Sequence, residues 1–210
     1  MGVWEQEALR LCDRYVREVV LAFDLCPWAE GSLRAGRVSR AVCMTPAPVP
    51  AECLPFVDTL DSSNVPSMDI GLLIFPRHSG GWSAFDGFAE RVRRALGERR
   101  ARRADTKPTD AAAARFLVAA FHPAGAETFV GPHQMVSFVR RTPDPLLQFV
   151  RVEIIDRLKD SQPEMSEVVT RRNHEALRGE RALQLDAVTR AIHVDRDATY
   201  ARLRSDPNAA

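Results

Sequence analysis

Asp69-Ile70-Gly71-Leu72-Leu73-Ile74-Phe75 is a short, continuous apolar run that ends at Pro76. An uninterrupted run of this length is typical of a strand buried on both faces, as in α/β proteins. Arg115–Phe121, with the sequence RFLVAAF, has the same character and is closed by His122 and Pro123. Each of the two runs predicts a buried strand.

The segments around these two runs alternate between strand and helix patterns. A third strand is expected at Arg37–Met44, before the proline-rich residues 46–50. Helical spacing of apolar residues predicts helices at residues 3–24, 51–61, 83–97, 144–159, 164–178 and 180–193. We therefore expect an α/β fold: a small sheet of three or four strands flanked by helices, with a helical C-terminal third. A single domain is expected over residues 1–193, followed by a polar C-terminal tail at 194–210.

The composition excludes several classes of protein. The chain has 210 residues, of which 45% are hydrophobic, so it can bury a substantial core. Its 29 basic and 28 acidic residues give a net charge of +1, which argues against a general nucleic-acid or membrane-surface role. No apolar run approaches the roughly 20 residues that span a bilayer. Residues 1–7 do not resemble a secretory signal.

The cysteines indicate a reducing environment. Cys12, Cys26, Cys43 and Cys53 form no CxxC pair, and the chain contains no HExxH motif. A structural zinc site is therefore not expected, and the four residues are interpreted as reduced thiols. This pattern favours a cytoplasmic location.

His122 is the first candidate for chemistry. It follows a predicted buried strand, where α/β proteins often place their ligands, and the proline after it favours an extended backbone. A histidine held rigidly there could act as an acid or base near neutral pH, or bind a metal. The alternative is a histidine that only hydrogen-bonds the neighbouring loop.

Cys26 is the second candidate, in the segment Cys26-Pro27-Trp28 that follows the first helix. The turn could expose its sulfur as a nucleophile or as a ligand of iron, with Trp28 contacting the substrate. Two observations oppose this interpretation. Free cysteines are usually buried, and a helix C-terminus raises the pKa of a thiol.

Four further residues are candidates for substrate binding. Arg140 and Arg141 precede the helix predicted at 144–159, whose N-terminus would also attract a carboxylate or phosphate. Arg151 lies among apolar residues and is expected to pair with an acid or with the ligand. Asn173 is a poor helix former inside a charged helix, which hints at a specific hydrogen bond.

Four segments in order resemble one family, the bacterial domain-of-unknown-function 1415 family. They are Leu25-Cys26-Pro27-Trp28-Ala29, Ala120-Phe121-His122-Pro123, Arg141-Thr142-Pro143-Asp144-Pro145 with Arg151, and Arg172-Asn173 with Leu177-Arg178. The resemblance covers about residues 4–179. It implies a shared fold and a cluster of Cys26, His122, Arg141 and Arg151, without naming a reaction. Gln148 and Phe75 depart from the family pattern, which usually has a histidine at the first position and His-Pro at the second.

These observations lead to three hypotheses. The first is an enzyme that acts on a small anionic metabolite at a site built from His122, Cys26 and arginines; an iron or haem oxidoreductase, with His122 or Cys26 as metal ligand, is its sharpest form. The second is a metal-free enzyme with a Cys26–His122 thiol–imidazole pair. The third is a non-catalytic binding or assembly module, with homo-oligomers formed through the C-terminal helices.

Overall fold

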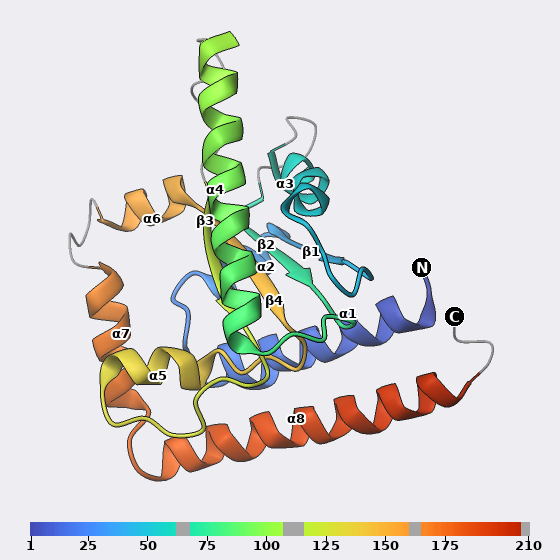
Figure 1. Cartoon of the computed structure of the whole chain (residues 1–210). Coiled ribbons are helices and arrows are strands. Elements are labelled where there is room, and N and C mark those ends of the chain that lie inside the picture. The colour runs from blue at the N-terminus through green and yellow to red at the C-terminus, as the bar shows by residue number, and fades with distance from the viewer. Residues whose placement is uncertain (62–67, 107–115, 160–164, 207–210) are drawn as a thin grey trace.

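The computed structural model describes residues 1–61, 68–106, 116–159 and 165–206 (Figure 1). Its centre is one four-stranded sheet in the order β1-β2-β4-β3. The strands are β1 (Val38–Val42), β2 (Ile70–Ile74), β3 (Phe116–Phe121) and β4 (Leu146–Arg151). β1 and β2 are parallel, whereas β4 runs antiparallel to both of its neighbours. The predicted α/β fold, with a small flanked sheet and a helical C-terminal region, is confirmed.

β2 is the strand predicted from the DIGLLIF run, and every one of its residues is buried. Gly71, the second residue of β2, allows the close approach of helix α3 (Leu54–Asp61). A Cβ atom at that position would lie 2.4 Å from a methyl carbon of Leu60. The continuous apolar pattern therefore has a direct cause, because packed helices cover both faces of this strand.

The prediction of a helix at residues 144–159 is wrong for the first half of this segment. Residues Leu146–Arg151 form β4, and only Val152–Lys159 form a helix, α6. The apolar run Leu-Leu-Gln-Phe-Val fits either structure, and pairing with both β2 and β3 decides for the strand. Neither Thr142 nor Asp144 caps a helix here. Instead the Thr142 hydroxyl donates to the carbonyl of Asp144 at 2.6 Å.

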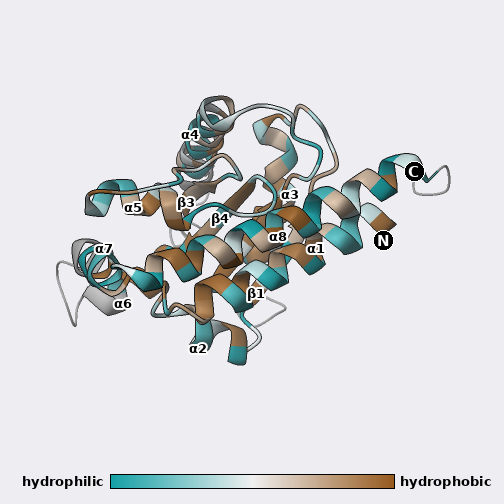
Figure 2. Ribbon diagram, turned by 90° about the horizontal axis from the view of Figure 1, so that it is seen from below, coloured by the Kyte–Doolittle hydropathy of each residue, from teal (hydrophilic) through white to brown (hydrophobic). Residues whose placement is uncertain are grey.

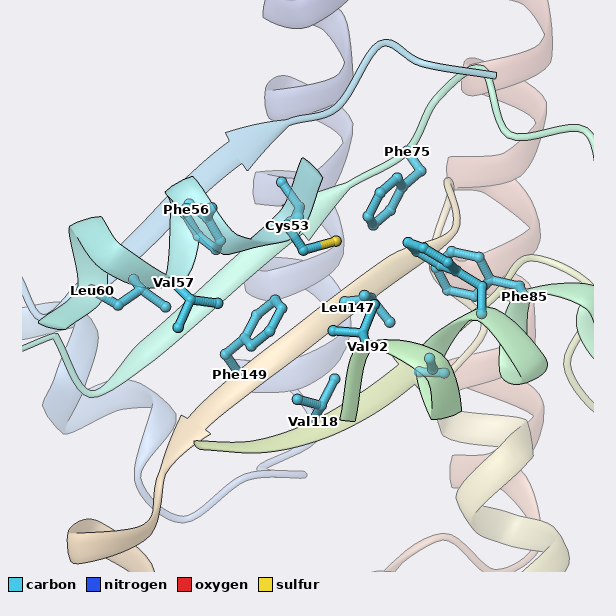
Figure 3. Packing of buried hydrophobic residues seen from close by; sticks show 14 residues of the cluster. Cys53, Phe56, Val57, Leu60, Phe75, Phe85, Val92, Val118, Leu147 and Phe149 are labelled. Atoms are coloured by element: carbon cyan, nitrogen blue, oxygen red, sulfur yellow. The ribbon is translucent and has the colours of Figure 1, made fainter. Parts of the chain in front are cut away.

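One face of the sheet carries a core rich in phenylalanine. Helices α3 (Leu54–Asp61) and α4 (Trp82–Thr106), with the 3₁₀ turn η2 (Pro50–Cys53), pack against it. Figure 3 shows Phe56 of α3 and Phe85 of α4 meeting Leu147 and Phe149 of β4. α4 continues beyond its predicted end at residue 97. Its residues 100–102, in a basic segment, are exposed.

The other face of the sheet is covered by the N-terminal helix over β1 and β2. Helix α1 (Val3–Tyr15) continues as the π-helical turn η1 (Val16–Leu21), and the short α2 (Ala29–Arg34) follows. Ala8 and Cys12 of α1 pack on alternate residues of β2. An ion pair at 2.7 Å between Arg40 of β1 and Asp13 of α1 adds to this contact. α1 thus leaves the β3–β4 half of this face for other elements.

The polar tail predicted at 194–210 is not observed where the structure describes the chain. Helix α8 runs from Glu180 to Ser205 and lies antiparallel beside α1, with the two termini at the same end (Figures 1 and 2). Tyr200 is buried and stacks on Trp4, with ring centroids 4.9 Å apart. The polar residues on the outer side of this helix make the segment look uniformly polar in the sequence, although a stripe of its residues is buried. Helices α5 (Pro132–Val139) and α7 (Met165–Ala176) complete the fold and lie near the N-terminal end of α8 (Figure 1).

Among the helices that the structure describes, none combines the length and the hydrophobicity that crossing a bilayer requires.

Candidate functional site

A cavity of about 570 Å³ opens over the half of the sheet that α1 leaves uncovered. Its floor is formed by alternate residues of β3 and β4, which point to the same face. They are Leu117, Ala119, Phe121, Gln148 and Val150. Residues of η1, α5 and α7 and of the loop before α2 form the walls. We call this space the Arg140 cavity, after the arginine in its wall.

The loop that carries Cys26 and Trp28 is anchored by α7. The side-chain amide of Asn173 donates to the carbonyl of Leu25 at 2.8 Å, and Arg172 donates to the carbonyl of Asp24 at 2.7 Å. The specific hydrogen bond predicted for Asn173 is confirmed. Cys26, Trp28 and Asn173 all line the Arg140 cavity. Two segments nearly 150 residues apart in sequence therefore meet here, while the functional roles predicted for these side chains stay predictions.

The Cys26 thiol is protonated at neutral pH. Burial raises its pKa to about 11, although the backbone N–H groups of Trp28 and Ala29 act in the opposite direction. A thiol with this pKa is a weak nucleophile at pH 7, because nucleophilic attack requires the thiolate. It can still donate a hydrogen bond or a proton to a bound molecule.

Arg140 contributes an unpaired positive charge. It follows α5, and its guanidinium carbon lies 5.1 Å from the centroid of the Phe121 ring. Within the described chain its side chain makes no hydrogen bond and no ion pair. Burial lowers the pKa of this guanidinium, and the charge of Asp86 offsets the effect only in part. The charge is therefore partly dehydrated and lacks an acidic partner.

Gln148 and Trp28 add further polar groups to the wall. Gln148 lies in the central strand β4 between Leu72 of β2 and Ala119 of β3. Its amide has no hydrogen-bond partner among the described residues. The indole N–H of Trp28 is buried and also lacks an acceptor there. A bound molecule could supply partners to both.

His122 does not line the Arg140 cavity. It follows Phe121 directly, so the two side chains point to opposite faces of the sheet, and His122 packs beside Phe85 of α4. Its Nδ1 accepts from the backbone N–H of Ala124 at 3.0 Å, so Nε2 carries the hydrogen and donates to the carbonyl of Gly80 at 3.1 Å. Burial lowers its pKa, which keeps the ring neutral. His122 joins two loops and lies away from Cys26.

Arg141 and Arg151 are both engaged within the protein. Arg141 is buried, pairs with Asp186 of α8 at 2.7 Å and donates to the carbonyl of Phe138. Arg151 donates to the carbonyls of Leu60 and Met68, at 2.7 and 2.9 Å, on the α3 side of the sheet. The structure thus separates the four residues that the resemblance placed in one cluster. No helix N-terminus follows Arg141 to help it bind an anion, because the next element is β4.

The two predicted metal ligands do not fit iron or haem. Both ring nitrogens of His122 are hydrogen-bonded to the backbone, and a metal needs a free imidazole nitrogen. Cys26 lies in a cavity whose described lining residues include no His, Asp or Glu as a second ligand. In the described chain, no group of three or more His, Cys, Asp or Glu side chains comes together in a way that could hold a metal ion.

Two residues of the cavity, Arg140 and Gln148, are not singled out by the sequence. Arg140 is a candidate only together with Arg141, and the sequence does not say which of the neighbours faces a ligand. Gln148 is the one polar residue in the apolar run Leu146–Val150, and that interruption was the available signal. A polar side chain on a buried strand needs a partner, and a bound molecule is one source of it.

Comparison with known proteins agrees with the sequence resemblance. Residues 7–187 match the family described as "Protein of unknown function (DUF1415)". No curated protein and no solved structure matches the chain. The matched range includes all four strands, the Cys26 loop, Arg140 and the part of α7 that carries Asn173. The chain belongs to the DUF1415 family.

Proposed function

We propose that this protein binds a small anionic metabolite in the Arg140 cavity and acts on it there. The observation that carries the proposal is the guanidinium of Arg140, which lies in the wall of a 570 Å³ cavity and has no hydrogen-bond or ion-pair partner among the described residues. A partly dehydrated charge without a partner costs stability, and proteins keep such a feature at sites where a ligand supplies the missing charge. An anion bound there would pair with Arg140 through two parallel hydrogen bonds.

The chemistry available in the cavity centres on Cys26. The described lining residues include no His, Asp or Glu, so a reaction on the bound molecule would use the protonated thiol as its proton donor. Gln148 would hold a polar group of the same molecule. The alternative thiol–imidazole enzyme has no support in the geometry, since Cys26 and His122 lie on opposite faces of the sheet.

The alternative assembly module has less support than ligand binding. The buried stripe of α8, which includes Leu185 and Ile192, packs within the chain against the N-terminal helix. A cytoplasmic location is part of the proposal, because four free cysteines suit a reducing compartment.

The test is a thermal-shift screen of small carboxylates and phosphates at constant ionic strength. A ligand at a hundred times its Kd adds about 2.7 kcal/mol of stability, which for a chain of this size raises Tm by about 5–10 °C. We expect this rise in the wild type and its loss in Arg140→Gln. The matched control is Arg94→Gln, which removes the same charge from an exposed position of α4 outside the cavity.

Stability measurements on the variants without ligand show whether a lost Tm rise reflects lost binding or a damaged fold. Arg140→Gln loses the contact with the Phe121 ring but also removes a dehydrated charge, so its stability should stay within about 1 kcal/mol of the wild type. A Tm rise that persists in Arg140→Gln, or that Arg94→Gln abolishes equally, contradicts the proposal.

A further inference from the structure

A second, smaller cavity of about 50 Å³ adjoins the Arg140 cavity, in the layer between α1 and the sheet. Five residues line both spaces: Tyr15, Val20, Cys26, Phe121 and Gln148. The remaining wall of the smaller space is mostly aliphatic, with Val16, Leu33, Val38, Ile70, Leu72 and Leu146 among its residues. We call it the apolar extension.

Apart from the Gln148 amide, which also faces the Arg140 cavity, the polar groups of the apolar extension are hydrogen-bonded or uncharged. The Tyr15 hydroxyl donates to the carbonyl of Val139, and the Thr142 hydroxyl donates to the carbonyl of Asp144. Burial raises the pKa of the Cys12 thiol to about 12, so this group is uncharged. A small cavity with such walls stays dry and accepts apolar groups in preference to water.

The charge of the Arg140 cavity selects the head group of a ligand. Two arginines line this cavity, and Arg93 is already engaged: it pairs with Glu90 and donates to the carbonyl of Val118 at 2.9 Å. Arg140 has no acidic partner in the part of the chain that the structure describes, so it supplies one unpaired positive charge. One guanidinium matches one planar carboxylate in charge and in geometry, whereas a phosphate dianion would stay half neutralised.

The positive charge and the apolar extension meet at the same side chain. Phe121 lines both spaces, and the guanidinium of Arg140 lies 5.1 Å from the centroid of its ring. A single short molecule can therefore contact both. A volume of 50 Å³ corresponds to about three or four water-sized groups, which is the space of a few carbon atoms.

From this arrangement we propose that the ligand is a short-chain monocarboxylate, with its carboxylate on Arg140 and its alkyl end in the apolar extension. This inference rests on the proposed function and names its substrate class. Cys26 and Gln148, which line both spaces, contact the middle of the bound acid.

The experiment is a calorimetric titration of the full chain with unbranched acids from acetate to octanoate at constant ionic strength. Each methylene that enters the apolar extension should raise the affinity about fourfold. The rise should stop once the extension is full, so that longer acids gain nothing more. The neutral alcohol 1-hexanol and inorganic phosphate serve as probes of the head group, and both should bind more weakly than hexanoate.

Two variants change the extension in opposite directions. Ala29→Leu adds side-chain volume, so the plateau should come at a shorter acid; Leu33→Ala removes volume, so it should come at a longer one. Both residues line the extension without lining the Arg140 cavity. Because the two shifts are opposite, failure of one variant to fold leaves the other as a test.

The outcomes distinguish this inference from the proposed function. Acids that bind through Arg140 with no dependence on chain length, or with a plateau that neither variant moves, overturn the inference and leave the function standing. Phosphate binding more tightly than hexanoate also overturns the inference. If no anion in the titration binds through Arg140, the proposed function fails as well.

Discussion

Asp195 in α8 joins the C-terminal helix to α1, and its replacement tests whether residues after 193 belong to the fold. Its carboxylate accepts hydrogen bonds from Arg10 at 2.8 and 3.2 Å and from Arg14 at 2.7 Å. These bonds lower the pKa of Asp195 from its ordinary 3.8 to about 2, with the Arg10 hydrogen bond as the largest cause. The unfolded chain lacks these bonds, so the pKa there returns to the ordinary value.

The size and sign of the effect follow from this difference in pKa. The drop from 3.8 to about 2 corresponds to at most about 2.4 kcal/mol of stability. The Asp195 side chain is 28% exposed, and Arg10 and Arg14 keep Glu7 and Glu18 as partners. We therefore expect Asp195→Asn to cost about 1–1.5 kcal/mol at pH 7. Because the folded pKa is lowered, this contribution is complete above pH 3.8 and disappears as the pH falls towards 2.

Urea denaturation of the wild type and Asp195→Asn at several pH values measures this contribution. The difference in unfolding free energy should be constant from pH 7 to pH 5, and about half of it should remain at pH 3. The matched control is Asp197→Asn, two residues further along α8. Its side chain is 71% exposed and pairs with Arg196. It should change stability by less than about 0.5 kcal/mol.

Two results would refute this reasoning. One is equal stability of the wild type and Asp195→Asn at pH 7, which would mean that the contact between α8 and α1 carries no net free energy at this pair. The other is a difference that does not shrink between pH 5 and pH 3. In that case the loss would come from packing and not from the ionised carboxylate.

Two further predictions concern the candidate site and the C-terminal helix. In a Cys43→Ser background, the alkylation rate of Cys26 should rise about tenfold per pH unit from pH 7 to pH 10, because its thiol has a pKa of about 11; rapid, pH-independent labelling would contradict this. Deletion of residues 194–210 removes the buried Tyr200, so the free energy of unfolding should fall by about 3 kcal/mol or more; unchanged urea denaturation would show that this segment is a tail after all.

The sequence was most informative where one local pattern has one structural solution. The run DIGLLIF between Asp69 and Phe75 predicted β2 because the six apolar or small residues after Asp69 suit a strand covered on both sides. Leu146–Arg151 was misread because its apolar residues suit a helix as well, and charged residues after Arg151 continue a helical pattern. Whether such a segment forms a strand or a helix is decided by its hydrogen bonds to two strands that are distant in sequence.

The candidate site shows the same division. Alternation along a strand already implies that His122 and Phe121 point to opposite faces, so part of the separation between His122 and Cys26 was available from the sequence. The sequence does not show that the Cys26 loop lies on the Phe121 face. That placement depends on where η1 crosses the sheet and on the bond from Asn173 to Leu25.

By itself, the sequence determined the α/β class, the buried central strand, the hydrogen-bonding role of Asn173 and the family resemblance. Only the tertiary structure decided which of two adjacent arginines, Arg140 or Arg141, faces the cavity. Arg141 is paired because α8 brings Asp186 within 2.7 Å, while Arg140 faces the cavity with no acid paired to it among the described residues. The physical reason is that burial follows from local apolar pattern, whereas the partner of a buried charge is set by contacts between distant segments.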